Sequence, residues 1–182
     1  MIVELTLNGE PVRLDAPPHW TLLRLLRDGV GQTDAKHGCG EGVCGACAVL
    51  LDGVAVNSCS VLAPQADGAR VETTAGLAKN GELHPLQAEM VQRGAVQCGF
   101  CTPGIVLSAI EAVRIGAAGS QEEIRHSLAG NLCRCTGYGK IVAAVEAYRD
   151  RAPDEGGAPA ERKRTPEGGE GAAPAPGVGI GP

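Results

Sequence analysis

The chain has 182 residues, enough for one or two domains, and only 2% of them are aromatic, so we expect an aliphatic core. The formal net charge is −5, and the folded part shows no basic run and few rings for base stacking, which argues against nucleic-acid binding. Neither a long apolar run nor a secretory signal is visible, so we expect no membrane span and interpret the cysteines as metal ligands in the reducing cytoplasm.

The first part of the chain carries the signals of a small mixed sheet crossed by one short helix. Asn8-Gly9 and Asp52-Gly53 are two-residue turns of the kind that close hairpins, and each stands between two apolar stretches. The leucines that follow Thr21 repeat at helical spacing and stop at Asp28-Gly29, which indicates a short helix. The expected strands are residues 2–7, 11–14, 48–51, 54–56 and 70–73.

From about residue 80 onward the apolar residues follow a helical period, and hairpin signals are absent. Pro85 stands in the first turn of one expected helix, Thr102 is expected to cap the next, and the run from Ser120 to Glu123 forms a capping box that opens a third. The four expected helices are residues 84–93, 103–115, 121–128 and 139–149. Four short helices with brief connections indicate a bundle.

The end of the chain differs in composition from the rest. Residues 151–182 are rich in proline, glycine and alanine and carry a small charged patch from Glu161 to Arg164. Such a segment buries too little apolar surface to offset the entropy of ordering it. We therefore interpret it as a disordered tail or linker.

Four cysteines in the first part of the chain have the spacing C-x4-C-x2-C, with the fourth further along. This first cysteine set is Cys39, Cys44, Cys47 and Cys59. The spacing is the plant-type ligand run of a [2Fe–2S] cluster. Glycines alternate with the cysteines, so the loop can turn tightly around an inorganic core and point N–H groups at its sulfurs. Structural zinc sites usually read C-x2-C twice, so we predict an iron–sulfur cluster here.

Four further cysteines lie in the helical part. This second cysteine set is Cys98, Cys101, Cys133 and Cys135. Each half of the set stands just before an expected helix, whose N-terminus stabilises thiolates through partial positive charge and free N–H groups. If the two helix N-termini face each other, four sulfurs meet. From spacing alone, C-x2-C combined with C-x-C fits zinc as well as an iron–sulfur cluster.

Taken together, the two cysteine sets resemble those of the small iron–sulfur subunit of the molybdenum hydroxylases, the family of xanthine dehydrogenase, aldehyde oxidoreductase and carbon monoxide dehydrogenase. The matching stretches are residues 38–47, 97–104 and 130–138, in that order. The resemblance implies an α+β fold, with a plant-type ferredoxin-like β-grasp domain over residues 1–76 and a four-helix domain over residues 82–150. It also implies two [2Fe–2S] clusters rather than one cluster and a zinc ion.

The resemblance further implies what each cluster contacts. The first cysteine set matches the ligands of the outer cluster, which lies towards a flavin, and the second set matches those of the inner cluster, next to the molybdenum cofactor. Gln97 and Cys135 match positions that touch the pterin of that cofactor, a molybdopterin expected in its cytosine dinucleotide form. The implied partners are a large molybdenum subunit and a medium FAD subunit, in a heterotrimer or a dimer of heterotrimers.

These expectations make the chain an electron-transfer subunit with no catalytic residue of its own. It would carry electrons from the molybdenum cofactor through two clusters to FAD or another acceptor. Trp20 and Tyr138 are interpreted as packing residues. Two alternatives remain: a free-standing [2Fe–2S] carrier or sensor, which has no need of the second cysteine set, and a zinc-stapled interaction module.

Overall fold

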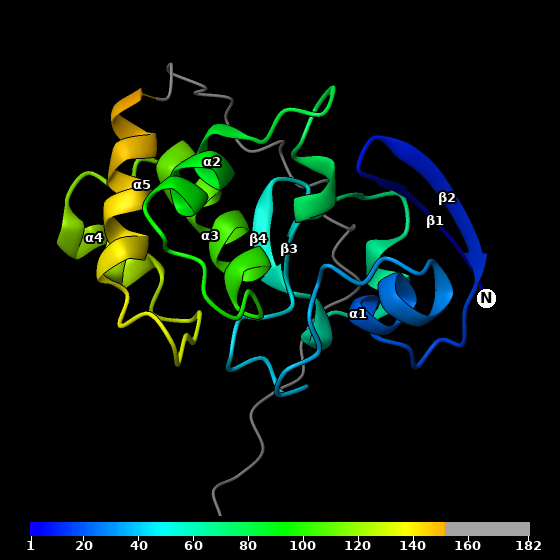
Figure 1. Ribbon diagram of the computed structural model, residues 1–182. Helices are drawn as coiled ribbons and strands as arrows, with labels where there is room; N and C mark the ends of the chain where they lie inside the picture. The colour runs from blue at the N-terminus through cyan, green and yellow to red at the C-terminus, as the bar shows by residue number, and fades with distance from the viewer. Residues whose placement is uncertain (152–182) are drawn as a thin grey trace, which may run out of the picture.

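The computed structural model describes residues 1–151 and has an α+β fold, which confirms the predicted class. The disordered tail predicted for the end of the chain lies outside the described residues, except for Arg151. Five strands form one mixed sheet in the order β2-β1-β5-β3-β4 (Figure 1). They are β1 (Ile2–Leu7), β2 (Glu10–Asp15), β3 (Ala48–Leu51), β4 (Val54–Asn57) and β5 (Arg70–Glu72).

Two tight turns build most of this sheet. Asn8 and Gly9 join β1 to β2 with φ of 52° and 92°, and Asp52 and Gly53 join β3 to β4 with φ of 50° and 84°. A type I′ turn needs positive φ at both central residues, which Asn, Asp and Gly tolerate best. Both predicted hairpins are therefore confirmed.

The short strand β5 connects the two hairpins. It runs parallel to β1, with Thr6 opposite Arg70, and antiparallel to β3, with Leu50 opposite Glu72. The Arg70 N–H also donates to the Asp52 carboxylate at 2.8 Å. The turn of the second hairpin thereby fixes the position of β5.

The helix α1 (Leu22–Arg24) and the π-helical turn that continues it (Leu25–Gly29) share one buried core with side chains of β1, β3 and β5. Thr21 caps this helix, because its Oγ1 accepts a hydrogen bond from the Arg24 N–H at 3.2 Å. The aliphatic core beneath it confirms the composition-based expectation. Its buried members include Val3, Leu5, Leu7, Leu22, Leu23, Leu25, Leu26, Val49 and Val71.

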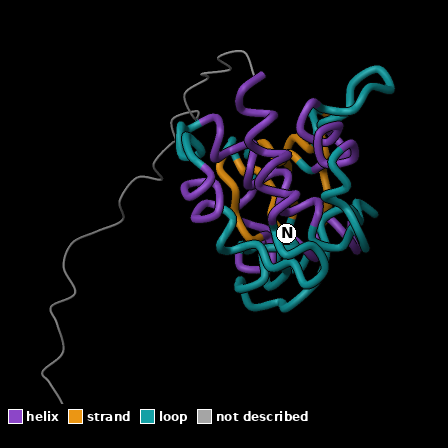
Figure 2. Tube along the Cα trace, turned by 60° about the vertical axis from the view of Figure 1, so that its left-hand side comes forward, coloured by secondary structure: helices purple, strands orange, loops and turns teal. Residues whose placement is uncertain are grey.

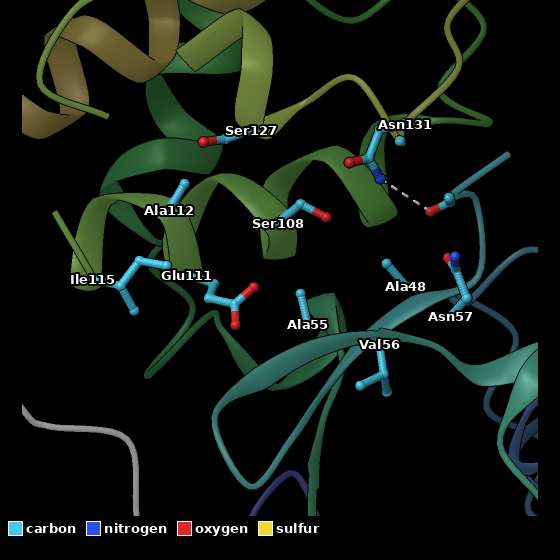
Figure 3. Close-up of a pocket in the computed structure, with 12 residues that line it drawn as sticks. Ala48, Ala55, Val56, Asn57, Ser108, Glu111, Ala112, Ile115, Ser127 and Asn131 are labelled. Carbon is cyan, nitrogen blue, oxygen red and sulfur yellow. Dashed lines mark hydrogen bonds between the residues drawn. The ribbon is translucent and has the colours of Figure 1, made fainter. Parts of the chain in front are cut away.

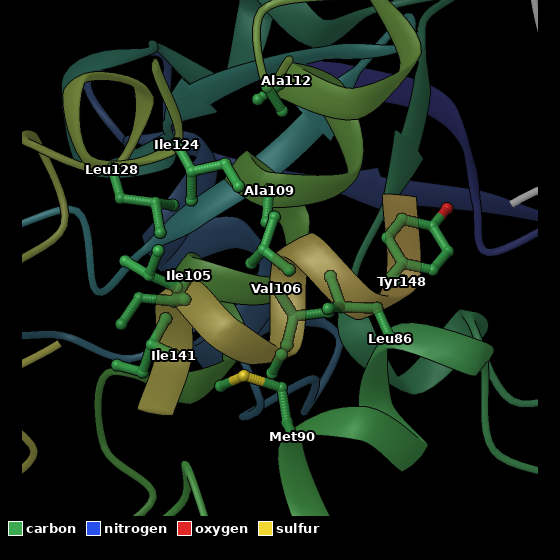
Figure 4. Close-up of a cluster of buried hydrophobic side chains, with 14 of the residues drawn as sticks. Leu86, Met90, Ile105, Val106, Ala109, Ala112, Ile124, Leu128, Ile141 and Tyr148 are labelled. Carbon is green, nitrogen blue, oxygen red and sulfur yellow. The ribbon is translucent and has the colours of Figure 1, made fainter. Parts of the chain in front are cut away.

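The second half of the described chain is helical and has its own core. The helices are α2 (Pro85–Gln92), α3 (Thr102–Arg114), α4 (Gln121–Ser127) and α5 (Gly139–Arg151). Their buried side chains include Leu86, Met90, Ile105, Val106, Ile124, Leu128, Ile141 and Tyr148 (Figure 4). Ser120 caps α4 by accepting from the Glu123 N–H at 3.2 Å, as predicted.

Most helix boundaries lie within one residue of the prediction, and two differences have a clear physical reason. Thr102 is not the cap of α3 but its first residue: Cys101 takes the capping position, and its carbonyl accepts from the Ile105 N–H at 3.1 Å. Helix α5 continues to Arg151 instead of ending at 149, because Arg151 pairs with the buried carboxylate of Glu89 on α2. A buried carboxylate needs such partners, and this ion pair accounts for the two additional helical residues.

Helix α3 joins the two halves. It contacts β3 and β4 on one side and the helices α2 and α4 on the other. A helix enclosed on several sides is apolar around most of its circumference, and α3 buries seven residues of its thirteen. Figure 2 shows helices in front of the strands and several long loops at the lower end of the view. Among the described helices, none is both long and apolar enough to cross a membrane.

Asp34 fastens the start of the loop that carries the first cysteine set to the chain beyond β5. Its carboxylate accepts hydrogen bonds from the Thr74 hydroxyl (2.9 Å), the Ala75 N–H (2.8 Å) and the Gln32 amide (2.7 Å). Burial acts to raise the pKa of this carboxyl, but the hydrogen bonds outweigh it and hold the pKa below its ordinary value of 3.8.

We expect Asp34→Asn to lower the free energy of unfolding at pH 7 by about 1–3 kcal/mol, because an amide cannot accept all of these hydrogen bonds. Since the folded pKa lies below the unfolded one, the carboxylate stabilises the fold above about pH 4, and this stability is lost as the pH falls through the folded pKa. Urea denaturation of both proteins between pH 7 and pH 3 measures the difference. A difference that stays constant with pH would contradict the role of the charge.

Candidate metal centres

The loop before β3 points backbone N–H groups at the sulfurs of the first cysteine set. The Gly42 N–H donates to Cys59 Sγ at 3.2 Å, the Glu41 N–H to Cys39 Sγ at 3.3 Å, and the Cys39 N–H to Cys44 Sγ at 3.4 Å. N–H groups aimed at sulfur stabilise thiolates and the sulfurs of a cluster. The predicted glycine-rich cradle is therefore present in the structure.

Glycine is required at two positions of this loop for lack of space. A Cβ at Gly38 would lie 2.8 Å from Cys44 Sγ, and one at Gly42, where φ is +77°, would lie 2.6 Å from Ser60 Oγ. Both distances are shorter than real Cβ contacts. The backbone can follow the sulfurs this closely only without side chains.

The pKa values of two cysteines in this set are shifted in opposite directions. Backbone N–H groups, chiefly that of Glu41, lower the pKa of Cys39 to about 6. Burial, assisted by the neighbouring thiol of Cys59, raises the pKa of Cys47 to about 11. Cys47 and Cys59 are buried, whereas Cys39 and Cys44 are half-buried. Two ligands of the first cysteine set therefore lie in the protein interior, and the other two lie nearer the surface.

The second cysteine set comes together from two loops. Cys98 Sγ lies 3.6 Å from Cys135 Sγ, and Cys133 Sγ lies 3.1 Å from the Thr136 hydroxyl. Burial and the adjacent Cys133 raise the pKa of Cys101 to about 12. Cys98 and Cys135 are exposed, and so is Gln97 beside them. This set therefore reaches the surface of the chain.

Within each cysteine set, the sulfurs lie as two pairs. The pairs are Cys39 with Cys44, Cys47 with Cys59, Cys98 with Cys135, and Cys101 with Cys133. A [2Fe–2S] cluster takes two thiolates at each iron, whereas zinc takes three or four ligands around one point. The donor sets fit two-iron clusters.

The loops of the two cysteine sets touch each other. The Leu132 N–H donates to the Cys44 carbonyl at 2.9 Å, and the buried Asn131 side chain donates to the Gly45 carbonyl at 3.2 Å (Figure 3). A Cβ at Gly104, near the start of α3, would lie only 2.1 Å from the same Gly45 oxygen. The two candidate centres are thus held together by backbone contacts.

Sequence reasoning missed these contact residues. Asn131 and Gly104 stand inside the stretches that carry the family resemblance, but their partner Gly45 is 86 residues away from Asn131. Tyr138, interpreted from the sequence as a packing residue, does pack against the helical core. Its hydroxyl also accepts from the Cys133 N–H at 2.7 Å, so packing is only part of its role.

Two family models match this chain. One, described as a 2Fe-2S iron-sulfur cluster binding domain, covers residues 5–78, and the other, a [2Fe-2S] binding domain, covers residues 73–146. Fold, cysteine geometry and family models together define a protein with two iron–sulfur domains.

Proteins of similar sequence show which family of iron–sulfur proteins the chain belongs to. The chain is 46% identical over 149 residues to the nicotinate dehydrogenase small FeS subunit of Eubacterium barkeri, covering 82% of this chain and 95% of that protein. It is 48% identical over 145 residues to the xanthine dehydrogenase iron-sulfur-binding subunit of Escherichia coli O157:H7, covering 79% and 91%. The chain belongs to the family of small iron–sulfur subunits of the molybdenum hydroxylases, as the sequence predicts.

Solved structures of the same family have a similar fold. A chain of quinoline 2-oxidoreductase from Pseudomonas putida 86 matches with a TM-score of 0.78 and 40% identity, over 83% of this chain and 96% of that chain. Aldehyde oxidoreductase from Desulfovibrio desulfuricans matches with a TM-score of 0.77 and 41% identity, over 81% of this chain but only 17% of that one. In the second case the likeness covers one part of a much longer chain.

Proposed function

We propose that this chain is the electron-transfer subunit of a molybdenum-containing oxidoreductase complex. When bound, its two [2Fe–2S] clusters supply one-electron redox chemistry between a molybdenum cofactor and an acceptor such as FAD, both held by partner subunits. The observation that carries this proposal is the presence of two four-cysteine sets whose loops touch. A single-cluster carrier or sensor needs only the first of them.

The cysteines divide between two clusters in this proposal. Cys39, Cys44, Cys47 and Cys59 hold the outer cluster, and Cys98, Cys101, Cys133 and Cys135 hold the inner one. The close sulfur pairs support two ligands at each iron. The chain then comprises a β-grasp domain over 1–76 and a four-helix bundle over 82–150, supported by the separate aliphatic core of each half.

The exposed side of the second cysteine set is proposed as the face that meets the large molybdenum subunit. Gln97 and Cys135 are both exposed there and would touch the pterin of the molybdopterin cofactor, in its cytosine dinucleotide form. Large apolar side chains next to these ligands in the sequence are also exposed: Val96, Phe100 and Leu132. Exposed apolar groups around a ligand set favour a protein partner.

The remaining partner is a medium FAD subunit, proposed to accept electrons from the side of the first cysteine set. The complex would be a heterotrimer or a dimer of heterotrimers. A cytoplasmic location is proposed because all eight cysteines are free and required as thiolates, which a reducing compartment maintains.

We expect the purified chain to be brown and to contain about four irons with matching acid-labile sulfide, because each [2Fe–2S] cluster holds two irons. EPR of the dithionite-reduced protein should show two distinct [2Fe–2S] signals. A colourless protein that contains zinc would instead establish the zinc-stapled interaction module. A single EPR signal with about two irons per chain would refute the two-cluster proposal.

Purification under gentle conditions separates the proposal from a free-standing carrier. The proposed subunit should co-purify with a molybdopterin-bearing chain and with a flavoprotein. Isolation of the chain alone, with both clusters intact and no such partner, would favour the carrier or sensor.

A further inference from the structure

Tyr138 has an unusual backbone conformation. Its φ is +65°, in the left-handed region that side chains rarely adopt, and it lies between Gly137 and Gly139. The other non-glycine residues with positive φ in the described chain are Asn8, Asp52 and Asn80. These are Asn and Asp, the residue types that tolerate this region, whereas a bulky tyrosine there is strained. Such strain persists only where the surroundings impose it, and it gathers at functional sites.

The strained backbone directs the tyrosine hydroxyl back to the ligand loop of the second cysteine set. The Cys133 N–H donates to Tyr138 Oη at 2.7 Å, and Tyr138 Oη donates to the Asn131 carbonyl at 2.8 Å. The Thr136 hydroxyl accepts from the Tyr138 N–H at 3.2 Å and thus holds the residue from the backbone side. The phenol therefore clamps the backbone immediately before a ligand.

The clamped segment is the one that touches the first cysteine set. Asn131 binds the Gly45 carbonyl through its side chain, and Leu132 binds the Cys44 carbonyl through its N–H. One hydrogen bond and the backbone of Leu132 therefore connect the main chain of the ligand Cys44 to that of the ligand Cys133. This is a short connection between the two cysteine sets, and it passes through the residues that Tyr138 holds.

We propose that Tyr138 is a positioning residue that keeps the Leu132–Cys44 contact closed and thereby sets the electronic coupling between the two clusters. This inference rests on the proposed function. The step that depends on this contact is the transfer of one electron from a reduced cluster at the second cysteine set to an oxidised cluster at the first. The hydroxyl acts by holding the backbone that connects the two centres. Its hydrogen bonds go to the Cys133 N–H and the Asn131 carbonyl, and not to a ligand sulfur.

Tyr138→Phe tests the hydroxyl alone, because the ring and its packing against the helical core are kept. In the complete complex, we expect amide hydrogen exchange at residues 131–133 to become about tenfold faster, since a lost hydrogen bond changes local opening by about that factor. The magnetic splitting between the two reduced clusters in EPR should shrink, and inter-cluster electron transfer should slow. Tyr148→Phe is the matched control, because Tyr148 lies in the helical core against the ring of His84. It should leave all three measurements unchanged.

A variant with wild-type exchange and wild-type splitting would overturn the proposal. If Tyr138→Phe loses the inner cluster, Asn131→Ala decides, because it keeps the tyrosine and removes only the side-chain bond to Gly45. Faster exchange at residue 132 with a smaller splitting in this variant supports the proposed link between the Leu132–Cys44 contact and the coupling of the clusters, whereas faster exchange with an unchanged splitting overturns it. Absence of two [2Fe–2S] signals in the unmodified complex would instead refute the proposed function.

Discussion

Replacing Cys135 by serine should remove the inner cluster, so that iron falls from about four to about two atoms per chain. Cys135 supplies one of two sulfurs in an exposed pair, 3.6 Å from Cys98, and a serine oxygen does not replace a thiolate as a ligand of soft iron–sulfur iron. Substrate should still reduce the partner subunit, while turnover with the natural acceptor falls to background. Metal analysis, EPR of the reduced complex and steady-state assays measure these effects.

The reciprocal variant is Cys39→Ser, which removes one ligand of the first cysteine set and serves as the control for Cys135→Ser. It should abolish the other EPR signal and preserve the one that Cys135→Ser removes. If Cys135→Ser keeps both signals and normal turnover, the assignment of this residue to the inner cluster is wrong. If both variants lose the same signal, the two cysteine sets do not hold separate clusters.

The local features of the fold were predictable because their causes are local. Asn8-Gly9 and Asp52-Gly53 adopt positive φ in the structure for the same reason that they signal hairpins in the sequence. Thr21 caps its helix with a hydrogen bond to a residue three positions on. In each case, the interaction that decides the structure lies within a few residues of the signal.

The features that escaped prediction depend on partners far along the chain. No local signal indicates that Arg151 pairs with Glu89, so the last two residues of α5 were missed. The parallel pairing of β5 with β1 joins segments more than sixty residues apart, and a strand of three residues has little periodicity to report it. Spacing likewise identified the cysteine sets but not the sulfur pairs within them.

The candidate site shows the same division. The sequence predicts all eight cysteines as ligands from type and spacing, and the structure places them as four close pairs. The residues that join the two sets, Asn131, Leu132 and Tyr138, use backbone carbonyls or backbone N–H groups as partners. Backbone groups are present at every position, so sequence patterns carry no mark of which one is used.

The contact between Gly104 and Gly45 yields the second large prediction. We expect Gly104→Ala to lower the free energy of unfolding by about 1–3 kcal/mol through overpacking, because its Cβ would lie 2.1 Å from a backbone oxygen that has no free rotamer to move away. Alanine is the better helix former, by about 1 kcal/mol in a helix interior, and the effect is smaller in the first turn where residue 104 stands, so the clash prevails.

Gly139→Ala is the control for this variant, since Gly139 also lies in the first turn of a helix but its Cβ would meet nothing within 4 Å. It should leave stability unchanged or slightly raised. Relief of the clash at Gly104 requires the Gly45 loop and α3 to separate, and this shift disturbs the neighbouring Cys44, whose carbonyl binds the Leu132 N–H. Urea denaturation should therefore reveal the loss of stability, and EPR should reveal a weaker interaction between the two reduced clusters. If Gly104→Ala is as stable as the wild type and keeps the full interaction, the close approach of α3 to this loop is not what holds the two centres together.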